Sequence, residues 1–214
     1  HLGLFPNEIN DIIFTVGDPD RVKFVSRHFN SINLKKQKRE FLIHNGLYKG
    51  FPVSVLSTGI GTGNIDIVIN ELDIISNIDL KTGKLNNKKK QLNIIRLGTS
   101  ASIQPEINIG SILLSEFAIG FDNLLNFYSY ENEFEESLSI KLMKHLNIDD
   151  DNIKPYAFKC DDYLFNTLMS DKIFYQRYQK LWHIYARYIC ETIKYLINGL
   201  PHNSEYRNVY TKFM

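Results

Sequence analysis

The sequence contains only two cysteines, Cys160 and Cys190, among its 214 residues. Two thiols cannot supply the disulfide framework of a small secreted domain, and their spacing does not match that of a zinc site. The two side chains are therefore expected to be buried thiols in a reducing compartment, which favours a cytoplasmic location.

Long apolar segments and an excess of charge are also missing. No uninterrupted apolar run approaches the length that spans a bilayer, and residues 1–6 are too short and lack the cleavage pattern of a signal peptide. The 25 Lys and Arg residues nearly balance the 24 Asp and Glu residues, which gives a formal net charge of +1. Such a chain has no general field that attracts nucleic acid or an anionic membrane, so neither is expected as a partner and any anion site must be local.

The composition and the order of apolar segments indicate an α/β fold. Hydrophobic residues make up 43% of the chain and aromatic residues 13%, which suits one globular domain with a sizeable core. Short β-rich runs alternate with segments in which apolar residues recur at helical spacing, and ligands of such folds bind near strand ends. The predicted strands are 11–16, 41–44, 53–57, 92–97 and 111–114, and the predicted helices begin at residue 19 and span 65–75 and 133–145.

The segment Gly17-Asp18-Pro19-Asp20-Arg21 directly follows the first predicted strand. A glycine lets an anion approach the backbone closely, while Asp18 and Pro19 suit the cap and first position of a helix. The helix start is expected to present free N–H groups and a positive dipole end, and Arg21 adds a forked charged donor. On pattern alone, the alternative is a tight turn with a surface arginine.

A second candidate is Arg96-Leu97-Gly98-Thr99-Ser100, at the end of the predicted strand 92–97. Burying an arginine near the end of an apolar strand is costly unless it has an anionic partner. The glycine and the two hydroxyls that follow offer close approach and neutral donors. Two interpretations stay open here, an anion site and an ion pair between Arg96 and a carboxylate such as Asp18.

The remaining motifs give weaker evidence for a functional site. The glycines of residues 59–63 follow a GxGxG pattern rather than GxGxxG and lack a P-loop lysine, so they predict a sharp strand-to-helix turn. The lysine-rich stretch 81–91 predicts a solvated loop or hairpin, and Asp161-Asp162 predicts a helix cap. We find no Ser-His-Asp arrangement and no zinc spacing.

Together these segments resemble the uridine phosphorylases within the wider nucleoside phosphorylase family. The resemblance covers residues 1–130, fades through 131–173, and rests on the order and spacing of six pieces. They are HLGL at 1–4, GDPDRV at 17–22, REF at 39–41, STGIG at 57–61, RLGTS at 96–100 and IQPEINIGSILLSE at 103–116. It implies a three-layer α/β/α sandwich around a central mixed sheet, forming homodimers that group into homohexamers. We expect one domain over 1–214, family-like in 1–173 with an atypical tail in 174–214.

The resemblance also implies roles for individual residues. Inorganic phosphate, the co-substrate, would be bound by Gly17, Arg21, Arg39, Arg96 and Thr99. Arg96 would be the catalytic group, Arg39 would reach the phosphate of a neighbouring subunit, and His1 and Thr99 would contact the nucleoside. No organic cofactor is expected. A potassium ion at a subunit interface would be held by Glu40, Ile60 and Asn64, although Asn64 stands where a serine is expected.

The implied reaction is phosphorolysis of a nucleoside, most simply uridine, to ribose 1-phosphate and free base. Uridine phosphorylases bind the base and the ribose through PQGR-like and EMET-like segments, and no such string occurs after Tyr156. Two alternatives therefore stay open: an inactive phosphate-binding or assembly remnant, and a purine nucleoside phosphorylase. The arginines argue against a nucleosidase, which uses water and needs no phosphate site.

The last part of the chain departs from the family in composition. Residues 174–214 hold seven of the 12 tyrosines, with a helix predicted at 178–198. We hypothesise that the domain is C-terminally incomplete and that this tail is a truncated or frame-altered product. The chain also begins at His1 rather than at a methionine, so leading residues are expected to have been removed or left out.

Overall fold

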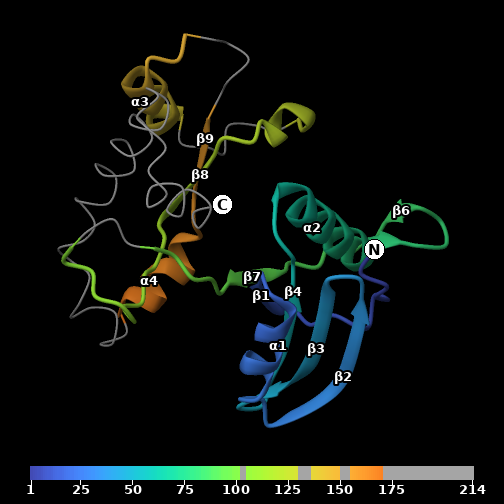
Figure 1. Ribbon diagram of the computed structural model, residues 1–214. Helices are drawn as coiled ribbons and strands as arrows, with labels where there is room; N and C mark the ends of the chain where they lie inside the picture. The colour runs from blue at the N-terminus through green and yellow to red at the C-terminus, as the bar shows by residue number, and fades with distance from the viewer. Residues whose placement is uncertain (102–104, 130–135, 150–154, 171–214) are drawn as a thin grey trace. The chain divides into compact units, whose positions relative to one another are not determined.

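A computed structural model describes residues 1–101, 105–129, 136–149 and 155–170 of the chain. The described residues fall into two compact units, one formed by residues 1–100 and the other by residues from Ala101 onwards (Figure 1). The helix predicted at 178–198 and the atypical tail lie outside the described residues. The expectation of a single domain stays a prediction.

The first unit contains a five-stranded mixed sheet with the strand order β2-β3-β4-β1-β7 (Figure 1). Strand β1 pairs in parallel with both β4 and β7, whereas β3 pairs antiparallel with both β2 and β4. These directions place the carboxyl ends of β1, β4 and β7 at the same edge of the sheet as the turn between β2 and β3. The strands are β1 (Ile12–Val16), β2 (Ser31–Lys38), β3 (Phe41–Tyr48), β4 (Phe51–Ser57) and β7 (Asn93–Arg96).

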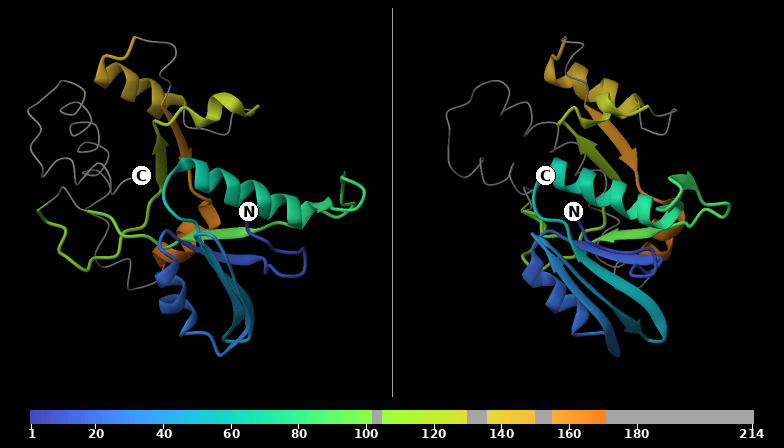
Figure 2. Two further views of the ribbon diagram at one scale, coloured as in Figure 1. Left: turned by 45° about the vertical axis from the view of Figure 1, so that its right-hand side comes forward. Right: turned by 90° about the vertical axis from the view of Figure 1, so that its right-hand side faces the viewer.

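Helices α1 (Pro19–Ser26) and α2 (Thr62–Asn77) cover opposite faces of this sheet (Figure 2). Because side chains alternate along a strand, each strand contributes to two cores. On one face, Val22 of α1 packs with Val16 and Val55 of the sheet. On the other face, α2 packs with residues that include Ile13, Ile43, Leu56, Val68 and Leu72. The expected three-layer α/β/α arrangement around a mixed sheet is confirmed.

Strand β2 was not expected from the sequence. Its partly buried Ile32 and Leu34 alternate with exposed Asn33 and Lys35, which is the period of a half-buried strand. The strand lies at the edge of the sheet, where an exposed side favours polar and lysine side chains. That polarity hides the apolar alternation in the sequence.

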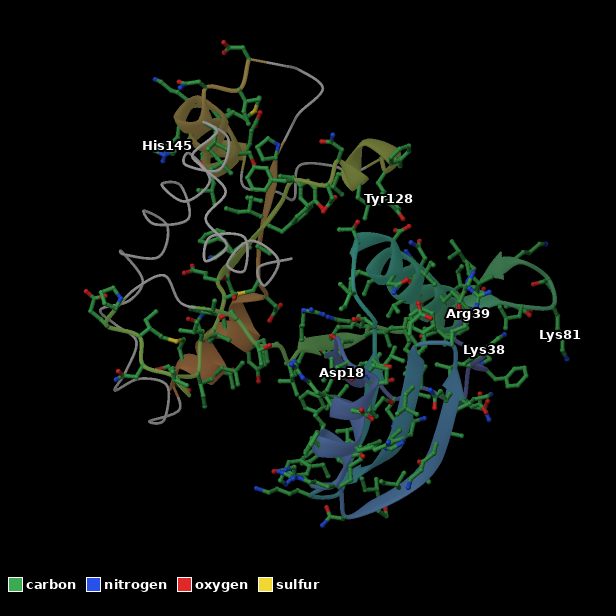
Figure 3. The ribbon with its side chains drawn as sticks, in the orientation of Figure 1. Asp18, Lys38, Arg39, Lys81, Tyr128 and His145 are labelled. Atoms are coloured by element: carbon green, nitrogen blue, oxygen red, sulfur yellow. The ribbon has the colours of Figure 1, made fainter. Side chains whose placement is uncertain are left out.

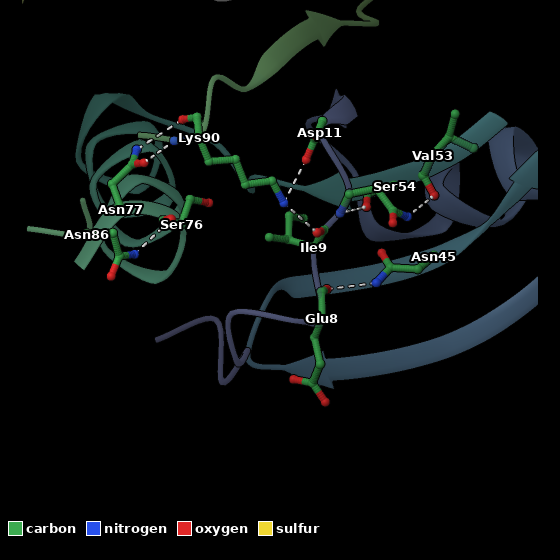
Figure 4. Close-up of polar contacts among 11 residues, drawn as sticks. Glu8, Ile9, Asp11, Asn45, Val53, Ser54, Ser76, Asn77, Asn86 and Lys90 are labelled. Carbon is green, nitrogen blue, oxygen red and sulfur yellow. Dashed lines mark hydrogen bonds and ion pairs between the residues drawn. The ribbon is translucent and has the colours of Figure 1, made fainter. Parts of the chain in front are cut away.

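The lysine-rich stretch forms a short hairpin, as expected. Strand β5 (Ile78–Asp79) pairs with β6 (Lys84–Leu85), and Lys81 at the tip is exposed (Figure 3). Asn86 and Lys90 anchor this stretch: Nδ2 of Asn86 donates to the carbonyl oxygen of Ser76, and Nζ of Lys90 lies 2.7 Å from Oδ1 of Asp11 and donates to the carbonyl oxygen of Ile9 (Figure 4). The rest of the hairpin is a solvated projection of the first unit.

The second unit pairs β8 (Phe117–Gly120) with β9 (Tyr156–Lys159). Helix α3 (Glu136–Leu146) packs Leu142 and Leu146 against Ile119 and Phe121. The unit also holds η1 (Leu124–Phe127) and α4 (Asp162–Ser170), and Oδ1 of Asp161 accepts from the N–H of Leu164, which confirms the expected cap. No helix within the described ranges is long and apolar enough to cross a membrane.

One predicted strand of this unit is wrong. Residues 111–114 are not a strand, and pairing starts only at Phe117, opposite Lys159. The apolar run 111–114 follows a turn in which the N–H of Ser111 donates to the carbonyl oxygen of Asn108, and in the described residues it has no strand partner. The helix predicted at 133–145 is present as α3, and residues 133–135 lie outside the described residues.

His44 of β3 is buried under α1, with 5% of its surface exposed. Its Nδ1 lies 2.8 Å from Oγ of Ser26, the last residue of α1. Burial lowers the pKa of His44 below its ordinary value, and the charges of Lys35 and Lys23 lower it further. The folded protein therefore favours the neutral imidazole.

We expect this histidine to make the protein less stable in acid. In the unfolded chain His44 binds a proton below about pH 6.5, whereas the folded state resists protonation, so the free energy of unfolding falls as the pH drops from about 6.5 through the folded pKa. A His44→Gln variant should show a shallower loss in urea unfolding between neutral and mildly acidic pH. An unchanged slope in the variant would contradict this assignment.

Candidate functional site

Three parallel strands deliver their carboxyl ends to one edge of the first sheet. Strands β1, β4 and β7 lead into Gly17, Thr58 and Leu97. The N–H of Thr58 donates to the carbonyl oxygen of Val16 at 2.8 Å, and the N–H of Leu97 donates to that of Thr15 at 2.8 Å. The pairing thus continues past the strand ends and holds the three connecting segments side by side.

Arg21 and Thr99 are in direct contact although they are 78 positions apart. Nη2 of Arg21 donates to Oγ1 of Thr99 at 3.3 Å. Arg21 lies in the first turn of α1, and Thr99 follows β7. The two glycine-containing motifs that the sequence singled out therefore form one site, and a guanidinium and a hydroxyl face the same space.

The start of α1 is closed by its own cap. Oδ1 of Asp18 accepts from the N–H of Asp20 at 2.9 Å, the N–H of Arg21 donates to the carbonyl oxygen of Asp18 at 3.0 Å, and Pro19 has no N–H. The expectation that free N–H groups of this helix would bind an anion is wrong for these residues. An anion here would instead meet the guanidinium of Arg21 beside Gly17, where an added Cβ would meet only the carbonyl oxygen of Gly59.

Arg96 is the last residue of β7 and lies opposite Thr15 in the parallel pair with β1. Its side chain is exposed, and it forms no ion pair with a carboxylate among the described residues. The pairing with Asp18 that the sequence left open is therefore not formed. Because Arg96 is exposed rather than buried, it does not require an anionic partner, and the anion site stays a prediction.

Arg39 and Glu40 form the two-residue turn between β2 and β3, closed by the pair Lys38 and Phe41. The turn lies at the same edge of the sheet as Gly17, and Arg39 and Asp18 are both marked there in Figure 3. Arg39 is exposed and has a φ of +56°, a left-handed conformation that costs an arginine about 1–2 kcal/mol. Lys49 has nearly the same φ, +51°, in the two-residue turn between β3 and β4, and such turns favour positive φ, so this conformation is explained by the hairpin itself.

Glu40 and Asn64 meet on either side of Gly59. A Cβ on Gly59 would clash with the amide nitrogen of Asn64 and would lie 3.1 Å from Cγ of Glu40. Ile60 is 90% exposed, so it offers only its carbonyl oxygen to a ligand. The carboxylate and this carbonyl suit a hard cation, and Asn64 suits one when its amide oxygen faces inward. The structure brings the three expected residues together, and the potassium ion stays a prediction.

Residues 11–174 match the Phosphorylase superfamily. The chain belongs to this superfamily. The match contains both of the motifs that meet at the Arg21–Thr99 contact.

Named relatives act on different nucleosides. A purine nucleoside phosphorylase DeoD-type from Thermoanaerobacter sp. (strain X514) is 30% identical over 146 residues, which cover 67% of this chain and 57% of the relative. A uridine phosphorylase from Thermococcus kodakarensis is 32% identical over 119 residues, which cover 56% of this chain and 38% of the relative. The chain thus spans about half the length of the relatives it matches.

A solved structure of the superfamily supports the same fold. The crystal structure of a Trypanosoma brucei nucleoside phosphorylase, described as showing uridine phosphorylase activity, matches with a TM-score of 0.64 and 26% identity. The match covers 77% of this chain and 56% of that one. The central mixed sheet of this chain is therefore that of a nucleoside phosphorylase.

His1 is held against α2. Its Nδ1 lies 2.6 Å from Oε1 of Glu71, and the N–H of Leu2 donates to Oε2 of the same carboxylate at 2.7 Å. His1 is therefore held by a side chain of α2 and does not extend freely into solvent. The contact of His1 with the ribose of a neighbouring subunit stays a prediction.

The sequence motifs assigned no individual role to Ser57 and Thr58, which lie at this edge of the sheet. Both are buried at the site edge, and both side chains bond to the backbone of neighbouring strands. The signal was present, because two adjacent hydroxyl residues end an apolar strand and a buried hydroxyl requires a hydrogen-bond partner. Which partner it finds depends on the order of the strands.

Proposed function

We propose that this chain binds inorganic phosphate at the carboxyl edge of its first sheet, with Arg21, Arg96 and Thr99 as donors beside Gly17. One observation carries the proposal. The guanidinium of Arg21 contacts Thr99, which follows Arg96 at the end of β7, and neither arginine forms an ion pair with a carboxylate in the part of the chain that the structure describes. Guanidinium groups without counter-charges match a phosphate dianion in both charge and donor geometry.

The proposed reaction of the full-length protein is phosphorolysis of a nucleoside. A phosphate oxygen forms a bond to C1′ while the C1′–N bond breaks, and the base leaves with the electron pair and takes up a proton. Arg96 and Arg21 would remove water from the phosphate and hold it under C1′. The bound dianion then stabilises the positive charge that develops on the sugar in the transition state.

Assembly completes the proposed site. Arg39 would extend to the phosphate of a neighbouring subunit, and His1 to its ribose, in a homodimer that groups into homohexamers. The exposure of Arg39 in its turn supports this role, because the side chain is available to a second chain.

Uridine is the proposed nucleoside. The motifs of residues 1–130 support it, as does the likeness to the Trypanosoma brucei protein that is described as showing uridine phosphorylase activity. A purine nucleoside is the second candidate, because the DeoD-type relative aligns over a larger share of the chain than the uridine phosphorylase does.

An assay of base release tests the proposed reaction. The protein is incubated with uridine or inosine, with and without phosphate, and free base is measured. We expect uracil release that requires phosphate. Phosphate-dependent hypoxanthine release instead would assign a purine substrate. No release from either nucleoside, together with a higher melting temperature in millimolar phosphate, would identify an inactive phosphate-binding remnant.

Replacing Arg39 with glycine should separate stability from phosphate binding. Glycine adopts a positive φ without steric cost, so Arg39→Gly should leave the free energy of unfolding unchanged or raise it by up to about 1 kcal/mol. Phosphate affinity should nevertheless fall about tenfold, because a charged donor is lost.

Lys49→Gly is the matched control for this change. Lys49 is also basic, also has a positive φ (+51°) and also lies in a two-residue turn, between β3 and β4 at the opposite edge of the sheet. It should behave like Arg39→Gly in urea unfolding and like the wild type in phosphate titration. Equal phosphate affinities in the two variants would remove Arg39 from the site.

A further inference from the structure

We infer that Ser57 and Thr58 are positioning residues that hold the phosphate-binding turns in place from the end of β4. The inference rests on the proposed phosphate site and assigns a role to two residues that do not touch the anion. Ser57 ends β4, and Thr58 follows it at the edge of the sheet that carries Arg21, Arg39 and Arg96.

Ser57 holds the turn that carries Arg39. Its side chain is fully buried, and its Oγ donates to the carbonyl oxygen of Glu40 at 2.6 Å and accepts from the N–H of Leu42 at 2.7 Å. The paired register of β3 and β4 reaches only as far as Ile43 opposite Leu56. The hydroxyl therefore continues the link between the two strands beyond their paired register, and it fixes Glu40, which follows Arg39 in the turn, and Leu42 near the start of β3.

Thr58 holds β1, the strand on the other side of β4. It is 1% exposed, its N–H donates to the carbonyl oxygen of Val16 at 2.8 Å, and its Oγ1 lies 3.3 Å from the same oxygen and 3.1 Å from the carbonyl oxygen of Gly59. Val16 directly precedes Gly17, the first residue of the segment that leads to Arg21. The two adjacent hydroxyl residues thus reach in opposite directions from β4, one toward Glu40 and one toward Val16.

This arrangement matters because phosphate binding depends on where the guanidinium groups stand. A displacement of about 1 Å in a site residue can cost a hundredfold in rate, and supporting hydrogen bonds help to hold site residues in place. Without the Ser57 hydroxyl, Glu40 of the turn and Leu42 of β3 would each lose a short hydrogen bond to β4. Phosphate affinity would then fall although no group that contacts phosphate has changed.

Ser54 provides a matched control within the same strand. It is also fully buried, and its Oγ accepts from the N–H of Asn10 at 3.0 Å, far from the carboxyl edge (Figure 4). Ser54 and Ser57 thus share residue type, strand, burial and a bond to the backbone of another segment. They differ in whether that bond ends at the phosphate-binding turns.

The test compares Ser57→Ala with Ser54→Ala in the full chain by thermal unfolding at increasing phosphate concentration. Both variants should melt a few degrees below the wild type, since each loses a buried hydrogen bond. Only Ser57→Ala should raise the Kd for phosphate, by about tenfold, and it should speed hydrogen exchange at the amide of Leu42. Thr58→Val, which keeps the backbone bond and the shape, should raise the Kd by a smaller factor and serves if Ser57→Ala does not fold.

Three results separate this inference from the proposed function. Equal Kd values for Ser57→Ala, Ser54→Ala and wild type would overturn the positioning role, while phosphate binding that is lost in Arg96→Ala keeps the phosphate site. An equal rise of the Kd in both serine variants would also overturn it, because the effect would then follow from general destabilisation. A wild-type protein whose melting temperature does not respond to phosphate would overturn the inference and the phosphate site together.

Discussion

Replacing Arg96 with alanine is expected to abolish the stabilisation of this protein by phosphate. Arg96 ends β7 without a carboxylate partner in the described residues, so its forked donors are available to an anion. Losing two charged hydrogen bonds should weaken phosphate binding about a hundredfold. At a phosphate concentration of about 100 times the wild-type Kd, stabilisation should fall from about 2.7 to less than about 0.5 kcal/mol.

Two further variants make the Arg96 result specific. Arg27→Ala removes the same charge from the end of α1, where the guanidinium lies 5.4 Å over the ring of Phe24, and it should keep full protection. Arg96→Lys keeps the charge without the fork and should give intermediate protection. Full protection in Arg96→Ala would show that phosphate is not bound at this edge.

Replacing Gly59 with alanine is expected to destabilise the protein by about 3 kcal/mol, the sum of a left-handed backbone cost and a steric clash. Gly59 has a φ of +68°, and a Cβ there would run into the amide of Asn64 and approach Glu40. Gly50→Ala is the control, because Gly50 has a φ of +83° and nothing within 4 Å of an added Cβ. It should cost only about 1 kcal/mol in urea unfolding.

A double variant identifies the source of the Gly59 effect. Asn64→Ser shortens the side chain that the new Cβ would meet, so combining it with Gly59→Ala should recover the steric part of the cost. The two changes should therefore be non-additive by about 1–2 kcal/mol. If Gly59→Ala and Gly50→Ala cost the same, Glu40 and Asn64 are not fixed around Gly59, and the candidate cation site loses its support.

The elements of the first unit that the sequence predicted are those whose pattern is set by burial. Strand β1 and helix α2 carry apolar residues at a regular period, and the cap at Asp18 followed by Pro19 marks the start of α1. Strand β2 escaped prediction because its outer residues face solvent and are largely polar. The run 111–114 has the composition of a strand, but pairing is a non-local property that composition cannot reveal.

Motifs identified the members of the candidate site but not their contacts. Gly17, Arg21, Arg96 and Thr99 stand out in sequence, whereas the bond from Arg21 to Thr99 exists only because the sheet places β7 beside β1. The helix amides failed as anion donors because Asp18 accepts from both of them, from Asp20 through its side chain and from Arg21 through its carbonyl oxygen. The roles of Ser57 and Thr58 depend on which strands flank β4, so no local pattern could assign them.

Two hairpins of the first unit, β2–β3 and β5–β6, differ in how much change in length they can absorb. In the two-residue turn at Arg39, an added residue must bulge the loop or slip β2 along β3, and a slip would put Asn33 and Lys35 in the places of Ile32 and Leu34. The exposed hairpin of β5 and β6 has only two paired positions, and lengthening its loop carries a small entropic cost. Over evolutionary time, insertions and deletions should therefore accumulate at residues 80–84, while the spacing between Lys38 and Phe41 stays constant.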